Sequence, residues 1–359
     1  MNACCVVGAR PQFVKAAALL RAAADMKIEI SLIHTGQHYD NKMSDVFFHE
    51  MNIPLPKYSL NIGGLSQGAM TGRMIEQLEA IFEKELPKNV IVFGDTNSTL
   101  AAAITASKMQ IPIAHIEAGL RSNNKQMPEE INRILTDHCS DMLFTPTAIS
   151  TANLIKEGIQ PEKIREVGDV MVDAFYYYVD KAKKHSTILS KLDLKPKKYV
   201  LATIHRAENI KDRIALSSIF DALMNISKDN TIVLPLHPAT KNALISANLL
   251  DKCEKFLKIV DPIGYLDMLM LQKGAKIIMT DSGGIQKEAY LSQTPCVTLR
   301  NETEWIELLE HGYNILGTTE SDKICKAFAE TNNKEEVDWN PYIYGNGGAS
   351  TKILNCIFS

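Results

Sequence analysis

Residues 111–141 read IPIAHIEAGLRSNNKQMPEEINRILTDHCSD, and this stretch decides the fold. A short apolar run ends at Glu117, a turn of small residues follows, and Pro128 opens a helix with two acids in its first turn. Proline at the first helical position and acids beside the helix N-terminus are both typical of a helix start. The stretch therefore predicts a buried parallel strand, a loop and a helix.

Glu117 stands at the carboxyl end of this strand, where open α/β sheets bind their ligands. Asp95 ends the preceding strand in NVIVFGDTN (89–97), so two adjacent parallel strands would present carboxylates at one edge. Simpler interpretations exist for Asp95 and for the two acids that follow Pro128. Asp95 could cap the helix that follows, and Glu129 and Glu130 could serve only as helix-terminal acids. The function is to be sought at this edge.

Alternation of strands and helices extends from this stretch along the whole chain. Apolar runs with strand character recur in the first half at residues 3–7, 28–35, 89–93, 142–145 and 164–169. The second half carries five more, at YVLATIH, TIVLPLHP, FLKIVDP, AKIIMTDS and PCVTLR. Helix-like stretches separate these runs, and no hairpin signature joins two of them. The pattern predicts an α/β fold with two doubly wound, Rossmann-like parallel sheets that face each other across a cleft.

The length of 359 residues suits two domains. We expect an N-terminal α/β domain at residues 1–168 and a C-terminal α/β domain at residues 198–344. A Tyr-rich and Lys-rich helical segment, residues 169–197, would connect them. The tail at residues 345–359 ends in an apolar-spaced helix, which we expect to pack back on the first domain.

Composition and charge argue against several classes of protein. Hydrophobic residues make up 45% of the chain and the net charge is -3, which argues against a general nucleic-acid or anionic-membrane surface. No apolar run approaches the roughly 18 residues that span a membrane. The seven cysteines are scattered, without CxxC pairs or a secretory leader, so we expect a cytoplasmic setting. The His, Cys and acidic residues do not follow metal-ligand spacings, and we expect no metal.

A second polar turn follows the first strand, in GARPQFVK at residues 8–15. Here a glycine turn opens a helix that carries two cations, Arg10 and Lys15, near its start. Free N–H groups at a helix N-terminus and nearby cations together favour an anionic ligand. A purely structural turn is the alternative, since the motif is not a dinucleotide-binding GxGxxG.

The second half carries its own candidate anion site at residues 281–288, DSGGIQKE, which follow a strand and open a helix. Backbone N–H groups from Ser282 to Gly284 can approach phosphate oxygens, because glycine has no Cβ. Glu288 lies one helical turn further, where a carboxylate can accept hydrogen bonds from both hydroxyls of a ribose. A tight packing turn is the alternative for the glycine pair. His205 ends another strand in a polar cluster, HRAEN, which favours a ligand-facing histidine over a buried, satisfied one.

Nine motifs occur together in one order: GARPQFVK, HTGQHYD, GDTNSTLA, HIEAGLRS, MPEEINRILTDH, HRAEN, PLHP, DSGGIQKEA and GNGGAS. With them the chain resembles the non-hydrolysing UDP-N-acetylglucosamine 2-epimerase family over residues 3–355. The resemblance implies the two-domain glycosyltransferase-B fold, a UDP-sugar bound between the domains, chemistry on the first domain and UDP on the second. It also implies inversion at C2 of an N-acetylhexosamine without an added cofactor, and a homodimer.

The resemblance further implies roles for single residues, matched motif by motif. The acid/base carboxylates would be Asp95, Glu117 and Glu129. His205, as a further catalytic group, would act at the diphosphate with Arg10, and the cations beside the reacting sugar would be Lys15 and Arg133. The diphosphate loop would be Ser282, Gly283 and Gly284, and the ribose anchor Glu288. Gln37 would bind substrate in the loop near which many bacterial members hold an activating UDP-GlcNAc; whether this chain is so activated stays open.

The family's chemistry explains the need for carboxylates. A proton on C2 beside an acetamido group is weakly acidic, so the route expels UDP as this proton leaves, giving a glycal, and adds UDP back after protonation from the other face. This requires a base, an acid, and support for the departing diphosphate. The sequence does not assign each carboxylate to a face. A glycosyltransferase or a hydrolysing epimerase fits less well, because of the three carboxylates and the opening GARPQFVK pattern.

One departure from the family pattern concerns the substrate. After Leu299 and Arg300, common members read Thr-Glu-Arg-Pro, whereas this chain reads TEWI, with Trp305 in place of the cation. With VGDVMVDAF at the domain joint, this resembles the branch that acts on UDP-2,3-diacetamido-2,3-dideoxyglucuronate for surface polysaccharide. UDP-N-acetylglucosamine is the alternative substrate, so the substituents at C3 and C6 stay open. Trp305 could pack on the added acetamido methyl or simply anchor its loop.

Overall fold

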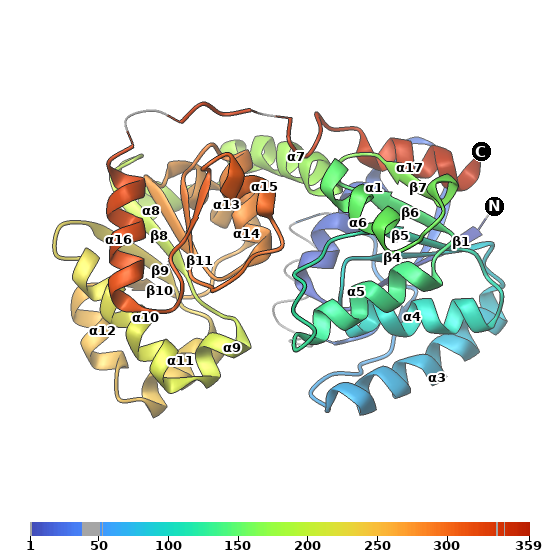
Figure 1. Cartoon of the computed structure of the whole chain (residues 1–359), viewed down its shortest axis with the longest axis horizontal. Helices are drawn as coiled ribbons and strands as arrows, with labels where there is room; N and C mark the ends of the chain where they lie inside the picture. Colours follow the sequence, from blue (N-terminus) through green and yellow to red (C-terminus); the bar gives the residue numbers. More distant parts are fainter. Residues whose placement is uncertain (1, 38–50, 52, 335–336, 341) are drawn as a thin grey trace. The chain divides into compact units, whose positions relative to one another are not determined.

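The computed structural model describes residues 2–37, 51, 53–334, 337–340 and 342–359 of the chain. Two compact units make up the chain: unit 1 comprises Met1–Tyr177 and Pro341–Ser359, and unit 2 comprises Tyr178–Asn340. Each unit contains one sheet, and helices alternate with the strands along the chain (Figure 1). Among the described residues, no helix combines the length and the apolar composition that a membrane span requires.

Unit 1 is built on a seven-stranded parallel sheet in the order β3-β2-β1-β4-β5-β6-β7. The strands are β1 (Asn2–Val7), β2 (Glu29–His34), β3 (Tyr58–Ser59), β4 (Asn89–Phe93), β5 (Ile113–Ile116), β6 (Met142–Thr145) and β7 (Ile164–Glu166). The described helices are α1 (Arg10–Asp25), α3 (Gln67–Glu85), α4 (Asn97–Lys108), α5 (Pro128–Cys139), α6 (Ala148–Lys156), the short η1 (Pro161–Lys163), α7 (Val170–His185), which crosses into unit 2, and α17 (Ala349–Phe358). The direction of winding reverses between β1 and β4, which is the topological switch point.

Unit 2 repeats this plan on a six-stranded parallel sheet in the order β10-β9-β8-β11-β12-β13. The strands are β8 (Tyr199–Thr203), β9 (Thr231–Pro235), β10 (Lys258–Val260), β11 (Ile277–Thr280), β12 (Cys296–Thr298) and β13 (Asn314–Leu316). The helices are α8 (Ile188–Lys191), α9 (Ala207–Lys211), α10 (Arg213–Ile226), α11 (Pro238–Ser246), α12 (Leu250–Phe256), α13 (Tyr265–Gly274), α14 (Gly283–Leu291), α15 (Ile306–Glu310) and α16 (Ser321–Asn332). The switch point here lies between β8 and β11.

Side chains along β8 explain why helices cover both faces of the second sheet. Val200 and Ala202 belong to a core shared with α10 and α16. Tyr199 and Leu201 belong to a different core, shared with α8 and α13. Successive side chains of a strand point to opposite faces, so a strand that is apolar throughout must be buried on both. The sequence YVLAT thus specifies a central strand.

The sequence prediction omitted two strands, β3 and β13. Both lie at the edge of their sheet and have two and three residues, respectively. Runs this short contain too few residues for an alternating pattern to stand out. The larger prediction, an α/β fold with two doubly wound parallel sheets, is confirmed.

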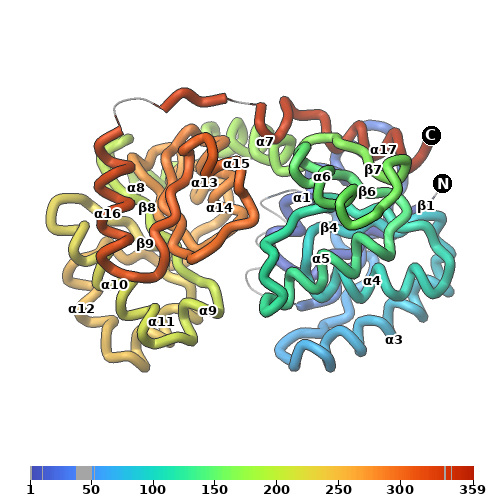
Figure 2. Tube along the Cα trace, viewed as in Figure 1, coloured from blue at the N-terminus to red at the C-terminus, as the bar shows by residue number. Residues whose placement is uncertain are grey.

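The C-terminal helix α17 belongs to unit 1 and packs on α1. Figure 2 shows both chain ends, blue and red, on this unit. The described tail supplies no side chain that caps α17. Instead, the carboxylate of Asp173 in α7 accepts the N–H groups of Gly348 at 2.6 Å and of Ser350 at 2.7 Å. The closing GNGGAS motif therefore begins a helix whose cap comes from another part of the chain.

Candidate active site

The strands β1, β4 and β5 are neighbours at the switch point of unit 1 (Figure 1). Gly8 follows β1, Asp95 follows β4 after one glycine, and Glu117 follows β5 directly. Carboxyl ends of parallel strands share one edge, and ligands bind there in this class of fold. The two carboxylates that the sequence singled out therefore lie at one edge of the sheet.

Glu117 is buried, with 7% of its surface exposed, and its backbone takes a left-handed φ of 69°. Its Oε2 pairs with the ammonium group of Lys15, which is buried in α1. A Cβ placed on Gly94 would lie 3.1 Å from this oxygen and 3.6 Å from the ammonium nitrogen. Left-handed residues other than glycine are uncommon and cluster at functional sites. The structure thus brings the predicted cation Lys15 onto a predicted acid/base residue.

Asp95 is paired with Arg133 of α5. Nε and Nη2 of Arg133 donate to one Asp95 oxygen at 3.0 and 2.7 Å, and 32% of the Asp95 side chain stays exposed. Nη1 of the same guanidinium donates to Glu130 at 2.6 Å. The cap of α4 is Thr96, whose hydroxyl accepts the N–H of Thr99. The interpretation of Asp95 as the cap of this helix is therefore wrong.

The two acids that open α5 have different surroundings. Glu130 is buried and accepts the N–H groups of Ser122 and Asn123 and the guanidinium of Arg133. Burial alone would raise the pKa of Glu130, but these donors hold it below its ordinary value. Glu129 is half-buried, and its carboxylate makes no hydrogen bond or ion pair within the part of the chain that the structure describes. Glu130 therefore orders the loop before α5 through these hydrogen bonds, whereas the carboxylate of Glu129 does not hold that loop.

The turn after β1 is held from inside the protein. Gln12, buried in α1, accepts the N–H groups of Gly8 and Ala9 at 2.8 and 3.1 Å and donates to the carbonyl of Phe93 at 2.8 Å. A Cβ on Gly8 would stand 2.0 Å from Oγ of Ser98, so only glycine fits. These two amides are therefore engaged within the turn. Sequence reasoning gave Gln12 no role, although it lies inside the GARPQFVK motif.

Two predicted binding residues flank this turn. Gln37 accepts the N–H and the hydroxyl of Ser98 at 3.0 and 2.8 Å, which ties the loop after β2 to the start of α4. Arg10 begins α1, but its side chain lies outside the described part of the structure. Residues 38–40 of the GQHYD motif lie outside it as well. Contacts of Arg10 with a diphosphate stay a prediction.

In unit 2, His205 and Asp281 lie just beyond the ends of β8 and β11, at the switch point. Asp281 is fully buried and accepts the N–H groups of His205 and Arg206 and the side-chain amide of Asn209, all at 3.0 to 3.1 Å. The His205 side chain is 43% exposed, with Nδ1 3.5 Å from an Asp281 oxygen. Asp281 therefore shapes the HRAEN loop, a role that sequence reasoning did not assign to it.

Residues 282–284 form the N-terminus of α14, and Ser282 caps this helix with its side chain. A Cβ on Gly283 would stand 2.4 Å from Oε1 of Glu304, so that carboxylate would have to move to accept a larger residue. A Cβ on Gly284 would meet no atom closer than 4.0 Å. The predicted diphosphate loop thus has one glycine that lies against the Glu304 carboxylate and one that faces open space beside a helix N-terminus, where anions bind.

Glu288, the predicted ribose anchor, is buried in α14. One carboxylate oxygen accepts the hydroxyl of Tyr265 at 2.9 Å, and the other accepts the side-chain amide of Gln272 at 2.7 Å. These donors fix the orientation of the carboxylate. Each carboxylate oxygen can accept more than one hydrogen bond, so a vicinal diol remains compatible with this arrangement.

Trp305, which replaces the expected cation, is only 3% exposed. The ammonium nitrogen of Lys287 in α14 lies 4.2 Å from the centre of its ring, within the range of a cation–π interaction. The backbone N–H of Trp305 donates to the hydroxyl of Thr303 at 3.2 Å, and this hydroxyl donates to the side-chain oxygen of Gln286 at 2.7 Å. These contacts fit the interpretation in which Trp305 anchors its loop.

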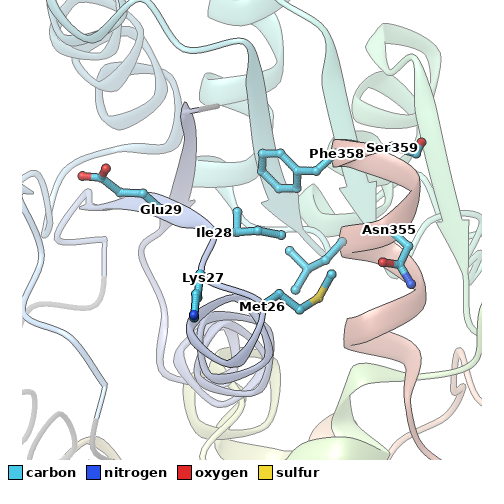
Figure 3. Close-up of a pocket in the computed structure, with 8 residues that line it drawn as sticks. Met26, Lys27, Ile28, Glu29, Asn355, Phe358 and Ser359 are labelled. Carbon is cyan, nitrogen blue, oxygen red and sulfur yellow. The ribbon is translucent and has the colours of Figure 1, made fainter.

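A pocket of about 630 Å³ lies elsewhere in unit 1 (Figure 3). Its lining comprises Met26, Lys27, Ile28, Glu29, Leu354, Asn355, Phe358 and Ser359. Glu29 begins β2, so this pocket lies at the amino ends of the parallel strands, opposite to the edge that carries Asp95 and Glu117. Its position argues against a part in chemistry at those carboxylates.

The family model for UDP-N-acetylglucosamine 2-epimerase matches residues 21–358. The chain belongs to this family. A UDP-N-acetylglucosamine 2-epimerase homolog of Methanococcus maripaludis is 47% identical over 355 residues, 98% of either protein. The UDP-2,3-diacetamido-2,3-dideoxy-D-glucuronate 2-epimerase of Pseudomonas aeruginosa is 45% identical over 352 residues, 97% of either protein. The crystal structure of Methanocaldococcus jannaschii UDP-GlcNAc 2-epimerase in complex with UDP-GlcNAc and UDP is similar with a TM-score of 0.94, at 42% identity over 99% of both chains.

Membership of this epimerase family makes the protein an isomerase, as the ordered motifs predicted. Its similarity to the solved epimerase structure confirms the predicted glycosyltransferase-B class of fold.

Proposed function

We propose that this epimerase inverts C2 of a UDP-N-acetylhexosamine without hydrolysis, by eliminating UDP and adding it back. The observation that carries the proposal is the pairing of carboxylates with cations after β4 and β5: Glu117 with Lys15, and Asp95 with Arg133. Carboxylates supply groups for proton transfer, and the cations offset the negative charge that develops as the diphosphate leaves. No added cofactor enters this scheme.

In the first half of the reaction, one carboxylate removes the C2 proton as the bond between the anomeric carbon and the diphosphate oxygen breaks. This step leaves a glycal and UDP. Protonation of C2 from the opposite face and return of UDP to the anomeric carbon then give the epimer. We assign the proton transfers to Asp95, Glu117 and Glu129, and support of the departing diphosphate to His205 and Arg10.

Unit 2 offers the groups for holding UDP. The N-terminus of α14 presents N–H groups beside Gly284, whose surroundings are open. The buried carboxylate of Glu288 lies one helical turn further along the same helix, and we assign it to the ribose hydroxyls. The solved complex of the Methanocaldococcus jannaschii relative with UDP-GlcNAc and UDP supports the proposal that this chain binds UDP.

We propose UDP-2,3-diacetamido-2,3-dideoxyglucuronate as the substrate, converted from the gluco to the manno configuration for surface polysaccharide. The relative from Pseudomonas aeruginosa carries that substrate in its name. In addition, Trp305 replaces the cation that common family members have in the loop after Arg300. UDP-N-acetylglucosamine is the second candidate, supported by the Methanococcus relative and by the Methanocaldococcus jannaschii complex with UDP-GlcNAc.

Comparison of kcat/KM for the two sugars tests this choice. A preference for the diacetamido-glucuronate below about tenfold, roughly 1.4 kcal/mol in transition-state binding, would favour plain UDP-N-acetylglucosamine. The same assays test the mechanism. Turnover in deuterated water should place one deuterium at C2 of the recovered UDP-sugar, and net release of free UDP would instead indicate a hydrolysing epimerase.

A further inference from the structure

A buried hydrogen-bonded pair, His115 with Asp137, lies next to the two strand-end turns of unit 1. His115, in β5, is fully buried; its Nδ1 stands 2.7 Å from Oδ1 of Asp137 in α5, and its Nε2 stands 2.8 Å from the carbonyl oxygen of Gly94. The imidazole therefore joins the carboxylate of α5 to the turn that follows β4. Neither His115 nor Asp137 has a part in the proton transfers proposed above.

The other oxygen of Asp137 extends this pair to the second turn. It accepts the N–H of Gly119 at 3.2 Å and pairs with Nη1 of Arg121 at 2.8 Å. Burial alone would raise the pKa of Asp137, but His115 first, and then Arg121, hold that pKa below its ordinary value. An ionised carboxylate in α5 therefore binds both β5 and the turn that follows it.

Both turns contain left-handed residues, and both shape the surroundings of a carboxylate. Gly94, with φ of 61°, precedes Asp95, and a Cβ on it would lie 3.1 Å from Oε2 of Glu117. Glu117 and Gly119 have φ of 69° and 80°. A residue other than glycine keeps such a conformation only where its surroundings hold it. The contact of His115 with the carbonyl of Gly94 restrains the first turn, and the hydrogen bond from the N–H of Gly119 to Asp137 restrains the second.

We propose that His115 and Asp137 are positioning residues, which set the placement of Asp95 relative to Glu117. One buried pair holds the backbone of both turns, so its loss shifts both carboxylates. Neither residue is accessible to substrate, since both are at most 1% exposed. Misplacement of reacting groups lowers the rate of chemistry more than substrate binding. The inference rests on the proposed function, in which these carboxylates transfer protons.

Asp137→Asn and His115→Ala test the inference, with Ile113→Ala as the matched control. Ile113 is fully buried at the opposite end of the same strand, so its truncation destabilises the fold without removing a contact to either turn. Well below the unfolding temperature, we expect Asp137→Asn and His115→Ala to lower kcat by about tenfold to a hundredfold, with KM within about threefold. Ile113→Ala should keep kcat within about threefold of wild type despite a lower Tm.

Wild-type kcat in Asp137→Asn would overturn the inference. It would also be overturned if Ile113→Ala, with a Tm equal to that of the other two variants, lost as much kcat as they do. If His115→Ala does not fold, Asp137→Asn decides, because it conserves side-chain volume. Glu117→Gln, assayed in parallel, separates the two proposals. Full activity in Glu117→Gln refutes its proton-transfer role, whereas a loss there beside an unchanged Asp137→Asn refutes only the positioning role.

Discussion

At the scale of single residues, the three carboxylates of unit 1 that we propose for proton transfer should control turnover and not folding. Asp95→Asn, Glu117→Gln and Glu129→Gln should each lower kcat by about two orders of magnitude or more, because each removes a group that transfers a proton. The measurement is kcat from product formation, with circular dichroism to show that the fold persists. Near-normal kcat in all three variants would contradict the assignment.

Glu130, next to Glu129, should behave in the opposite way. Glu130→Gln weakens a buried acceptor of two backbone N–H groups and Arg133, so we expect the free energy of unfolding at neutral pH to fall by about 1–3 kcal/mol. The folded-state pKa of Glu130 lies below its ordinary value of 4.5. Its stabilisation is therefore present above pH 4.5 and is lost as the pH falls through the folded pKa. Denaturant unfolding should show the gap between wild type and Glu130→Gln closing at acid pH; a gap independent of pH would contradict this.

The sequence predicts residues at element ends better than residues inside elements. Glu117 stands out because a charged residue interrupts an apolar run at a strand end, where ligands bind. His115 and Asp137 lie within a strand and a helix, and nothing in the periodicity shows that they meet across 22 positions of sequence. Glu129 and Glu130 are adjacent on one helix, so only the structure separates the buried acid from the half-buried one.

At the scale of elements, the attachment of α17 depends on Asp173. Asp173→Ala removes the only side-chain acceptor described for the first N–H groups of α17, and loss of such a cap costs about 1–2 kcal/mol. We expect faster hydrogen exchange in α17 and earlier proteolysis of the tail. Asp180→Ala is the control, since Asp180 lies on the same helix α7 but pairs only with the exposed Lys183 among described residues. Equal exchange in α17 for the two variants would exclude a capping role.

Sequence patterns predict some of the secondary-structure elements and miss others. Central strands such as β8 are apolar on both faces and are recognised directly. The edge strands β3 and β13 are short and pair with one neighbour each, so their existence depends on the neighbouring strand more than on their own residues. The cap of α17 comes from a helix whose contacting residue lies 175 positions away from Gly348, which no local pattern can indicate.

At the scale of the whole molecule, the two units repeat one strand order, and each carries its candidate residues at its own switch point. The sequence indicated this repetition because both halves alternate strands and helices without hairpins. The repetition also separates the tasks along the chain. Proton-transferring carboxylates belong to unit 1, and the helix start proposed for the diphosphate belongs to unit 2. Substitutions in the two units should therefore affect different kinetic constants.

Gly284→Ala tests this separation. The added Cβ meets no protein atom closer than 4.0 Å, so the fold and Tm should be retained. It occupies the open side of the α14 N-terminus, where we propose that phosphate oxygens approach. We expect the affinity for UDP, measured by calorimetry, to fall by about tenfold or more, roughly 1.4 kcal/mol, while kcat at saturating UDP-sugar changes little. Gly72→Ala in α3 is the control, because its added Cβ also meets open space but lies on unit 1. Wild-type UDP affinity in Gly284→Ala would place the diphosphate away from this helix start.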